Sequence, residues 1–162
     1  MSSLAELFVV ERSDLAPLVD AARPKRRLFG RARGGGFEEK FAARAREVDA
    51  FDASGHYFGV ALSYLDEEHG VSLGDAPELR DAAAAFIGSG MVTFILFDEH
   101  DARHLPKLDP AVHDEAALRH YCEEFWEEED PGAGRAMLDA IALLGRHIGS
   151  LDDGSVLVLR VG

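Results

Sequence analysis

Apolar residues recur along most of the chain at spacings of three and four, which predicts helices packed by one face. The most regular series, at spacings of four, three and four, is Met137, Ile141, Leu144 and Ile148. Similar spacing predicts further helices near residues 15–22, 37–48, 52–69, 77–87 and 109–125. The chain is therefore expected to be rich in helix.

Three shorter runs have the composition of β-strands. Residues 91–97 and 156–161 are almost continuously apolar, which is typical of strands buried on both faces, and residues 7–10 form a third, shorter run. Few strands among many helices predict an α+β fold, a helix-rich single domain spanning residues 1–162 with a small sheet of about three strands that includes the C-terminal strand. The order of the strands cannot be read from the sequence.

The expected helix ends carry recognisable capping residues. Asp109 and Asp130 each precede a proline, which predicts a capping oxygen followed by proline at the first helical position. Gly70 follows the apolar spacing of residues 52–69 and predicts a left-handed helix end. By the same spacing, Ile87 and Phe125 are expected to face the core.

The charge of the chain is unevenly distributed. Seventeen basic and thirty acidic residues give a formal charge of −13. Residues 23–33 hold six basic and no acidic residues, so subtracting +6 from −13 leaves −19 on the rest of the chain. Residues 23–36 are expected to form a basic, glycine-rich loop. An acidic body of this kind repels nucleic acid and anionic membranes and favours encounter with a basic protein.

The cellular compartment is predicted from the lack of a signal peptide, of a membrane span and of a cysteine pair. The first residues lack the basic and apolar segments of a signal peptide, and no apolar run approaches the roughly 20 residues of a membrane span. The lone Cys122 has no partner for an internal disulfide. These features predict a cytoplasmic protein, and the spacing of Cys122 from Leu118 and Phe125 predicts a buried thiol.

One histidine cluster has the spacing of metal ligands. His100 and His104 are four residues apart after an expected buried strand, so one α-helical turn would place both imidazoles on one face, with Asp98 as a third ligand. The order His-Asp-x-x-His approximates a helical zinc motif, but Pro106 leaves little room for the helix. The alternative is a solvated polar loop.

A glycine-rich segment is the other motif weighed for ligand chemistry. Gly34, Gly35 and Gly36 precede a helix and could cradle a phosphate, yet Glu38 and Glu39 stand where the anion would bind. No cofactor is therefore predicted.

The most acidic segment surrounds the only tryptophan of the chain. Its members are Glu123, Glu124, Trp126, Glu127, Glu128, Glu129 and Asp130. Acids at the end of a helix oppose the helix dipole and repel one another, so the segment is either a solvated helix end or a surface kept for a basic partner with Trp126 as anchor.

The layout of the chain resembles that of the uncharacterised YfbM-like bacterial proteins. The shared features are a short first strand, a helix that starts at Ser13-Asp14-Leu15, a middle aromatic helix and a final helix followed by a strand. The aromatic helix, with His56-Tyr57-Phe58, lacks the tryptophan of that family's central motif. No functional residue is carried over, and the chain is not assigned to that family.

These observations favour a non-catalytic acidic binding protein that docks a positively charged protein, as inhibitor or immunity proteins do. The first alternative is a metal-dependent enzyme that uses the His100/His104 cluster. A structural or regulatory subunit with a partner that is not basic is the third class considered. Oligomeric state and the identity of any partner are not predicted.

Overall fold

The computed structural model describes residues 3–24, 36–88 and 92–162. Its strands are β1 (Ala5–Glu11), β2 (Arg46–Phe51), β3 (Thr93–Phe97) and β4 (Ser155–Val161). Its α-helices are α1 (Leu15–Ala22), α2 (Phe37–Arg44), α3 (His56–His69), α4 (Pro77–Ile87), α5 (Glu115–Trp126) and α6 (Ala133–Gly149). Three 3-10 helices complete the described elements: η1 (Arg12–Asp14), η2 (Glu99–Lys107) and η3 (Pro110–Val112).

Within the described ranges the strands form one antiparallel sheet in the order β2-β1-β4-β3. The N-terminal and C-terminal strands are the two inner ones, and Leu159 of β4 lies between Leu7 of β1 and Ile95 of β3. The α+β fold with the C-terminal strand inside the sheet is therefore confirmed.

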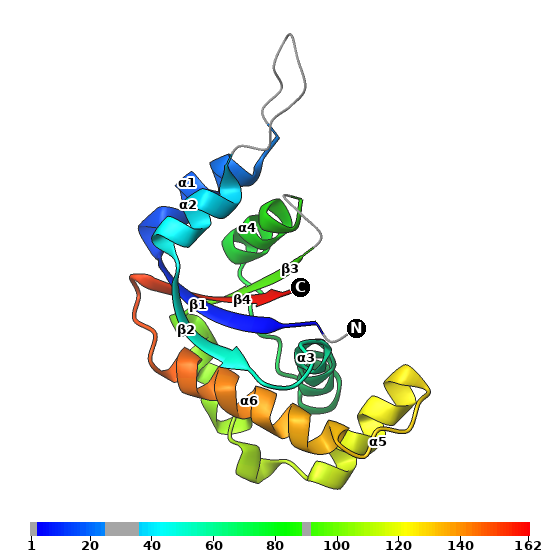
Figure 1. Cartoon of the computed structure of the whole chain (residues 1–162). Coiled ribbons are helices and arrows are strands. Elements are labelled where there is room, and N and C mark those ends of the chain that lie inside the picture. The colour runs from blue at the N-terminus through cyan, green and yellow to red at the C-terminus, as the bar shows by residue number, and fades with distance from the viewer. Residues whose placement is uncertain (1–2, 25–35, 89–91) are drawn as a thin grey trace.

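Helices cover both faces of the sheet, as Figure 1 shows, with α1, α2 and α4 on one side and α3 and α6 on the other. The alternation of β4 explains this arrangement, because successive side chains of a strand point to opposite faces. Val156 and Val158 join the apolar cluster under α1, α2 and α4, whereas Leu157 and Leu159 join the cluster under α3 and α6. All four are fully buried.

The helices predicted from regular apolar spacing are present. In α6 the four residues of the apolar series, 137, 141, 144 and 148, are fully buried. Helix α3 ends at Gly70, whose φ of 64° is left-handed as expected, and α4 has the predicted bounds. Two inward assignments are wrong: Ile87 is 43% exposed and Phe125 is 50% exposed.

Strand β2 was not predicted. The apolar spacing of residues 37–48 indicated a helix that reaches Val48, whereas α2 ends at Arg44. Ala45 is extended, with φ −86° and ψ 130°, and five of the next six residues pair with β1, all except Val48, which lies at a shift in register. The segment Arg46–Phe51 is charged and mostly exposed or half-buried, as suits an edge strand. Its pairing with β1 decides its structure more than its own apolar pattern does.

The predicted helix at Asp109 also differs. Asp109 accepts a hydrogen bond from the N–H of Ala111 at 2.9 Å, but only the short η3 follows. Helix α5 begins five residues later, where Asp114 accepts from the N–H of Ala116 at 2.9 Å. The proline motif therefore marks a single turn, and the long helix uses the next aspartate as its cap.

The basic loop predicted at residues 23–36 lies largely outside the described residues, which omit 25–35. Among the residues that are described, no helix combines the length and the apolarity needed to cross a membrane.

Candidate functional site

The acidic segment follows α5, a helix attached to the rest of the molecule by its buried face. Leu118 and Cys122 are buried there, and the helix ends at Trp126. The next residue, Glu127, has φ 54° and is the one non-glycine residue with positive φ in the described chain. This left-handed residue ends the helix and turns the chain toward residues 128–130.

Two aromatic rings are exposed at this helix end. Phe125 and Trp126 are each 50% exposed, and their ring centroids are 5.2 Å apart. The ring of Trp126 packs in a T-shaped arrangement with that of His56, the first residue of α3, and the two ring centroids are 5.6 Å apart. The exposure of Trp126 agrees with the hypothesis that it serves as an anchor.

The acids of the segment differ in their contacts. Glu123 pairs with Arg119 at 3.6 Å and Glu124 with His120 at 3.4 Å, each within α5. Asp130 accepts hydrogen bonds from the hydroxyl of Tyr57 and, at 3.0 Å, from the N–H of Gly132.

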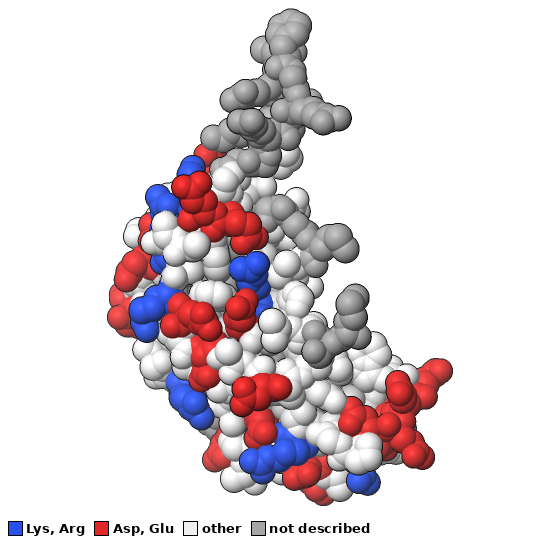
Figure 2. Space-filling model, in the orientation of Figure 1, with Lys and Arg blue, Asp and Glu red and all other residues white. Residues whose placement is uncertain are grey.

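The three remaining acids, Glu127, Glu128 and Glu129, form no ion pair with any part of the chain that the structure describes. Red side chains gather at the lower right of Figure 2, over the end of α5, whereas red and blue alternate on the upper part of that face. Three neighbouring carboxylates are thus without a cation partner among the residues that the structure describes.

A pocket of about 570 Å³ opens beside these acids. It is lined by Ser3, His56, Cys122, Trp126, Glu128, Glu129 and Asp130. Four of these residues, including Trp126, belong to the predicted acidic segment. Cys122 comes from the buried face of α5, His56 from α3 and Ser3 from the N-terminal segment. Sequence reasoning missed His56 and Ser3, because both lie at least 70 residues before Trp126 in the chain and neither belongs to a recognisable motif.

The pocket contains few groups suited to catalysis. Burial raises the pKa of the Cys122 thiol, and the nearby charges of Asp130 and Glu123 raise it further, so the thiol is protonated and a poor nucleophile. Burial, together with the hydrogen bond to Asp130, raises the pKa of Tyr57 to about 12. Neither group is prepared to take a proton from a substrate near neutral pH.

Two lining residues of the pocket, His56 and Ser3, contact the hydroxyl of Ser54. The hydroxyl of Ser54 is 2.7 Å from Nδ1 of His56 and 3.3 Å from the hydroxyl of Ser3. A nucleophilic serine needs a base that is itself oriented by a third group. In the described residues no acidic side chain forms a hydrogen bond or ion pair with His56, so the pair lacks that third group.

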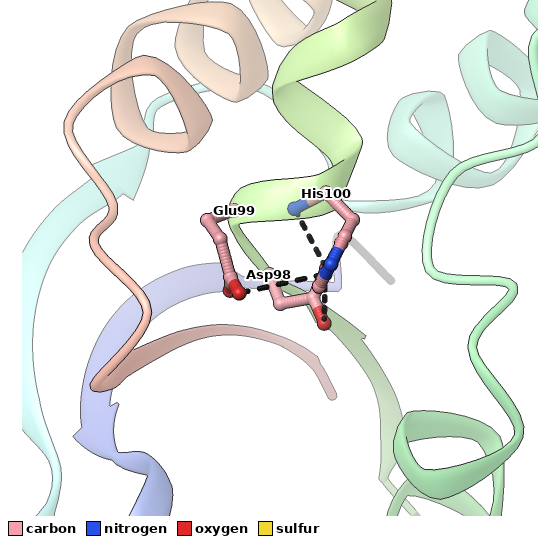
Figure 3. Close-up of side chains that lie close together, drawn as sticks. All are labelled: Asp98, Glu99 and His100. Carbon is pink, nitrogen blue, oxygen red and sulfur yellow. Dashed lines mark hydrogen bonds and ion pairs between the residues drawn. The ribbon is translucent and has the colours of Figure 1, made fainter.

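The predicted metal residues lie elsewhere, at the end of β3. Figure 3 shows Asp98, Glu99 and His100 turned toward one another, and their ligand atoms lie within 4.8 Å of each other. His100 Nδ1 is 3.5 Å from Asp98 Oδ2 and 3.4 Å from Glu99 Oε1. The structure therefore brings together two of the three predicted ligands, with Glu99 in addition.

His104 is not part of this group. Residues 99–107 form a 3-10 helix, which has three residues per turn, so residues four apart do not share a face. The Nε2 atom of His104 instead accepts a hydrogen bond from Nε of Arg103 at 3.0 Å.

An arginine of the chain already pairs with both carboxylates of the cluster. Nη2 of Arg12 is 3.1 Å from Asp98 Oδ2 and 2.9 Å from Glu99 Oε2. Burial on its own raises the pKa of Asp98, but the hydrogen bonds from Arg12 and His100 outweigh it and hold the pKa below its ordinary value. The Asp98 carboxylate is therefore charged and paired inside the fold.

Asp98 and Asp101 also cap η2 reciprocally. The side chain of Asp98 accepts from the N–H of His100 at 3.1 Å, and that of Asp101 accepts from the N–H groups of Asp98 and Gly74, each at 3.0 Å. These contacts are those of a capping box. Burial raises the pKa of Asp101, and the two N–H groups offset part of that effect.

Comparison with known proteins gives no relative. No protein-family model, curated protein or solved structure matches the chain.

Proposed function

We propose that this protein is a non-catalytic binding protein whose acidic surface at the end of α5 docks a positively charged protein partner, as an inhibitor or immunity protein does. One observation carries the proposal: Glu127, Glu128 and Glu129 have no cation of their own in the described chain, and they stand beside a half-exposed tryptophan and a pocket. Aromatic residues are the commonest anchors of protein interfaces.

The negative charge of this surface indicates that its partner is a basic protein. With a formal charge of −13, the chain attracts basic proteins from solution, and unpaired carboxylates contribute more to that attraction than paired ones. The same charge disfavours nucleic acid and anionic membranes. A protonated, buried Cys122 and a Ser54–His56 contact without a third group support binding over catalysis. A single cysteine suits a cytoplasmic location.

The proposal is tested by charge reversal. Protein partners are captured from an extract of the source organism, identified, purified and reconstituted with the wild-type protein and with the Glu127→Lys/Glu128→Lys/Glu129→Lys variant. We expect the variant to bind a basic partner at least about tenfold more weakly, mostly through a slower association rate, and we expect binding to weaken as salt is raised.

A matched control carries the same change of charge elsewhere. Glu11, Glu47 and Asp81 are exposed on β1, β2 and α4 and have no side-chain partner in the described chain. Reversing these three to Lys is expected to change affinity by less than about threefold, through the general field alone. Equal losses in the two variants, or a partner insensitive to both variants and to salt, would contradict docking at the end of α5.

A metal-dependent enzyme that uses His100 is the second candidate. The 4.8 Å grouping of Asp98, Glu99 and His100 favours it, and the Arg12 guanidinium already bound to both carboxylates weighs against it. Elemental analysis after dialysis against zinc decides the matter. About one zinc per wild-type chain, lost in His100→Ala, would support the enzyme, whereas equal zinc in both proteins would exclude this site.

A further inference from the structure

We propose that the pocket beside Trp126 receives an arginine side chain of the docking partner. The inference rests on the proposed function and adds to it a specific residue class and a specific place. A pocket of about 570 Å³ exceeds the volume of one guanidinium group with its aliphatic stem, and it falls in the usual range of about 300–1,000 Å³ for ligand pockets.

A comparison with the other pockets of the described chain supports a cationic occupant. Each of three others contains an arginine of the chain paired with an acid: Arg146 with Asp49 at 3.4 Å, Arg103 with Asp75 at 3.5 Å, and Arg12 with Glu78 at 3.5 Å. Among its described lining residues, the pocket beside Trp126 has three acids and neither arginine nor lysine. An arginine from outside would complete the same arrangement there.

The walls of the pocket suit a guanidinium on two sides. Trp126 is half exposed and offers an indole ring, on which arginine stacks more readily than lysine does. Glu128 and Glu129 offer carboxylates that have no partner among the described residues, and a carboxylate accepts two parallel hydrogen bonds from a guanidinium.

Two of the other lining groups, Asp130 and Cys122, neither repel a cation nor compete for the same oxygens. Both oxygens of Asp130 already accept hydrogen bonds, Oδ2 from Tyr57 and Oδ1 from Gly132. Asp130 therefore adds charge, and the two glutamates are left to make the direct contacts. The raised pKa of Cys122 keeps its thiol uncharged at the inner wall.

The occupant can be followed directly, because Trp126 is the only tryptophan and gives a single indole N–H signal in a ¹H–¹⁵N NMR spectrum. The probe is the peptide acetyl-Gly-Arg-Gly-amide, and its control replaces arginine by citrulline, which has the same shape and no charge. We expect saturable movement of the indole signal with a Kd of about 1–10 mM for arginine and at least about tenfold weaker binding for citrulline. Lysine in place of arginine is expected to bind more weakly than arginine.

Paired variants locate the contact. Glu128→Gln/Glu129→Gln removes the two lining carboxylates that have no partner in the described chain and is expected to weaken arginine-peptide binding at least about fivefold. Glu123→Gln/Glu124→Gln removes the same charge from acids that pair within α5 and is expected to change binding by less than about twofold. Both pairs lie on the surface, so both variants should fold.

The inference and the proposed function fail separately. Equal binding of arginine and citrulline peptides, equal effects of the two variant pairs, or no saturable movement of the indole signal would overturn the arginine pocket. If the reconstituted partner still loses affinity in the 127–129 reversal variant, the docking surface stands without the pocket. A partner insensitive to that reversal, together with saturable arginine binding, would instead leave a cation pocket without the proposed docking.

Discussion

Two groups of acids follow two secondary-structure elements in this protein, and they differ in what they contact. At the end of β3, Asp98 is 3% exposed, binds Arg12 and caps η2 with Asp101. After α5, Glu128 and Glu129 border a pocket and have no cation partner in the described chain. The first group belongs to the fold, because Arg12 pairs with Asp98 and because backbone N–H groups donate to Asp98 Oδ1 and to both oxygens of Asp101.

The comparison shows that the groups an acidic residue contacts say more about its function than the number of acids near it in the sequence does. Both groups were candidate sites from the sequence. Arg12, which neutralises the first group, lies 86 residues from Asp98 in the chain, and no spacing rule connects the two. Neutralised carboxylates stabilise a fold, whereas carboxylates without partners add repulsion that the fold tolerates.

The largest expected difference between the two groups is in stability. Asp98→Ala removes the partner of Arg12 and the acceptor for the N–H of His100, and should lower the free energy of unfolding by about 2–4 kcal/mol. Glu128→Ala should change it by less than about 0.5 kcal/mol. Urea unfolding of both variants measures this. Similar losses in both would show that the two groups do not differ in their contribution to the fold.

The pH dependence of stability should separate them next. The pKa of Asp98 is lowered in the folded protein, so its carboxylate stabilises the fold above the ordinary value of about 3.9, and this contribution is lost as pH falls through the folded pKa. Asp101 acts with the opposite sign: its raised pKa favours the protonated form, and its contribution is lost as pH rises through the raised value.

The Asp98→Asn variant isolates the first of these effects. Its deficit in unfolding free energy relative to wild type should be greatest near pH 7 and should shrink as pH falls below the ordinary aspartate pKa, because the lowered pKa of Asp98 is then approached. Urea titrations at several pH values provide the measurement, and Glu128→Gln, which lacks a partner to lose, serves as the reference. A deficit that stays constant with pH would mean that the charge of Asp98 does not matter to the fold.

The smallest expected effect on the free energy of unfolding comes from the backbone conformation and the charge of Glu127 at the end of α5. Glu127 is left-handed, a conformation that costs an L-residue about 1–2 kcal/mol and that glycine adopts readily. Glu127→Gly should therefore raise the free energy of unfolding by about 1 kcal/mol, and Glu127→Gln, which changes only the charge, by about 0.3 kcal/mol. Thermal unfolding of the two variants compares them. A glycine variant no more stable than the glutamine variant would contradict the backbone explanation.

Elements that carry their own apolar pattern could be predicted from the sequence, and those that depend on a neighbour could not. The apolar spacing of α6 and the apolar run of β4 predict which of their residues are buried. Strand β2 has no such pattern and is a strand because it pairs with β1. Phe125 follows the apolar spacing of α5 but lies at the end where the helix leaves the core.

The same limit applies to the candidate site. The acids and Trp126 are consecutive and visible in the sequence, but the pocket also needs His56 from α3, and the fold alone brings it there. The metal hypothesis assumed an α-helical turn between His100 and His104, and the 3-10 geometry of η2 separates them.

The central claim is that the acids after α5 are available to an external arginine and those at the end of β3 are not. Its most direct test is a ¹H–¹⁵N NMR titration of the whole wild-type protein with acetyl-Gly-Arg-Gly-amide, with the shift of every assigned amide recorded. We expect the largest saturable shifts at His56 and residues 126–130, and none above background at residues 98–101. Larger shifts at residues 98–101 than at residues 126–130 would contradict the claim.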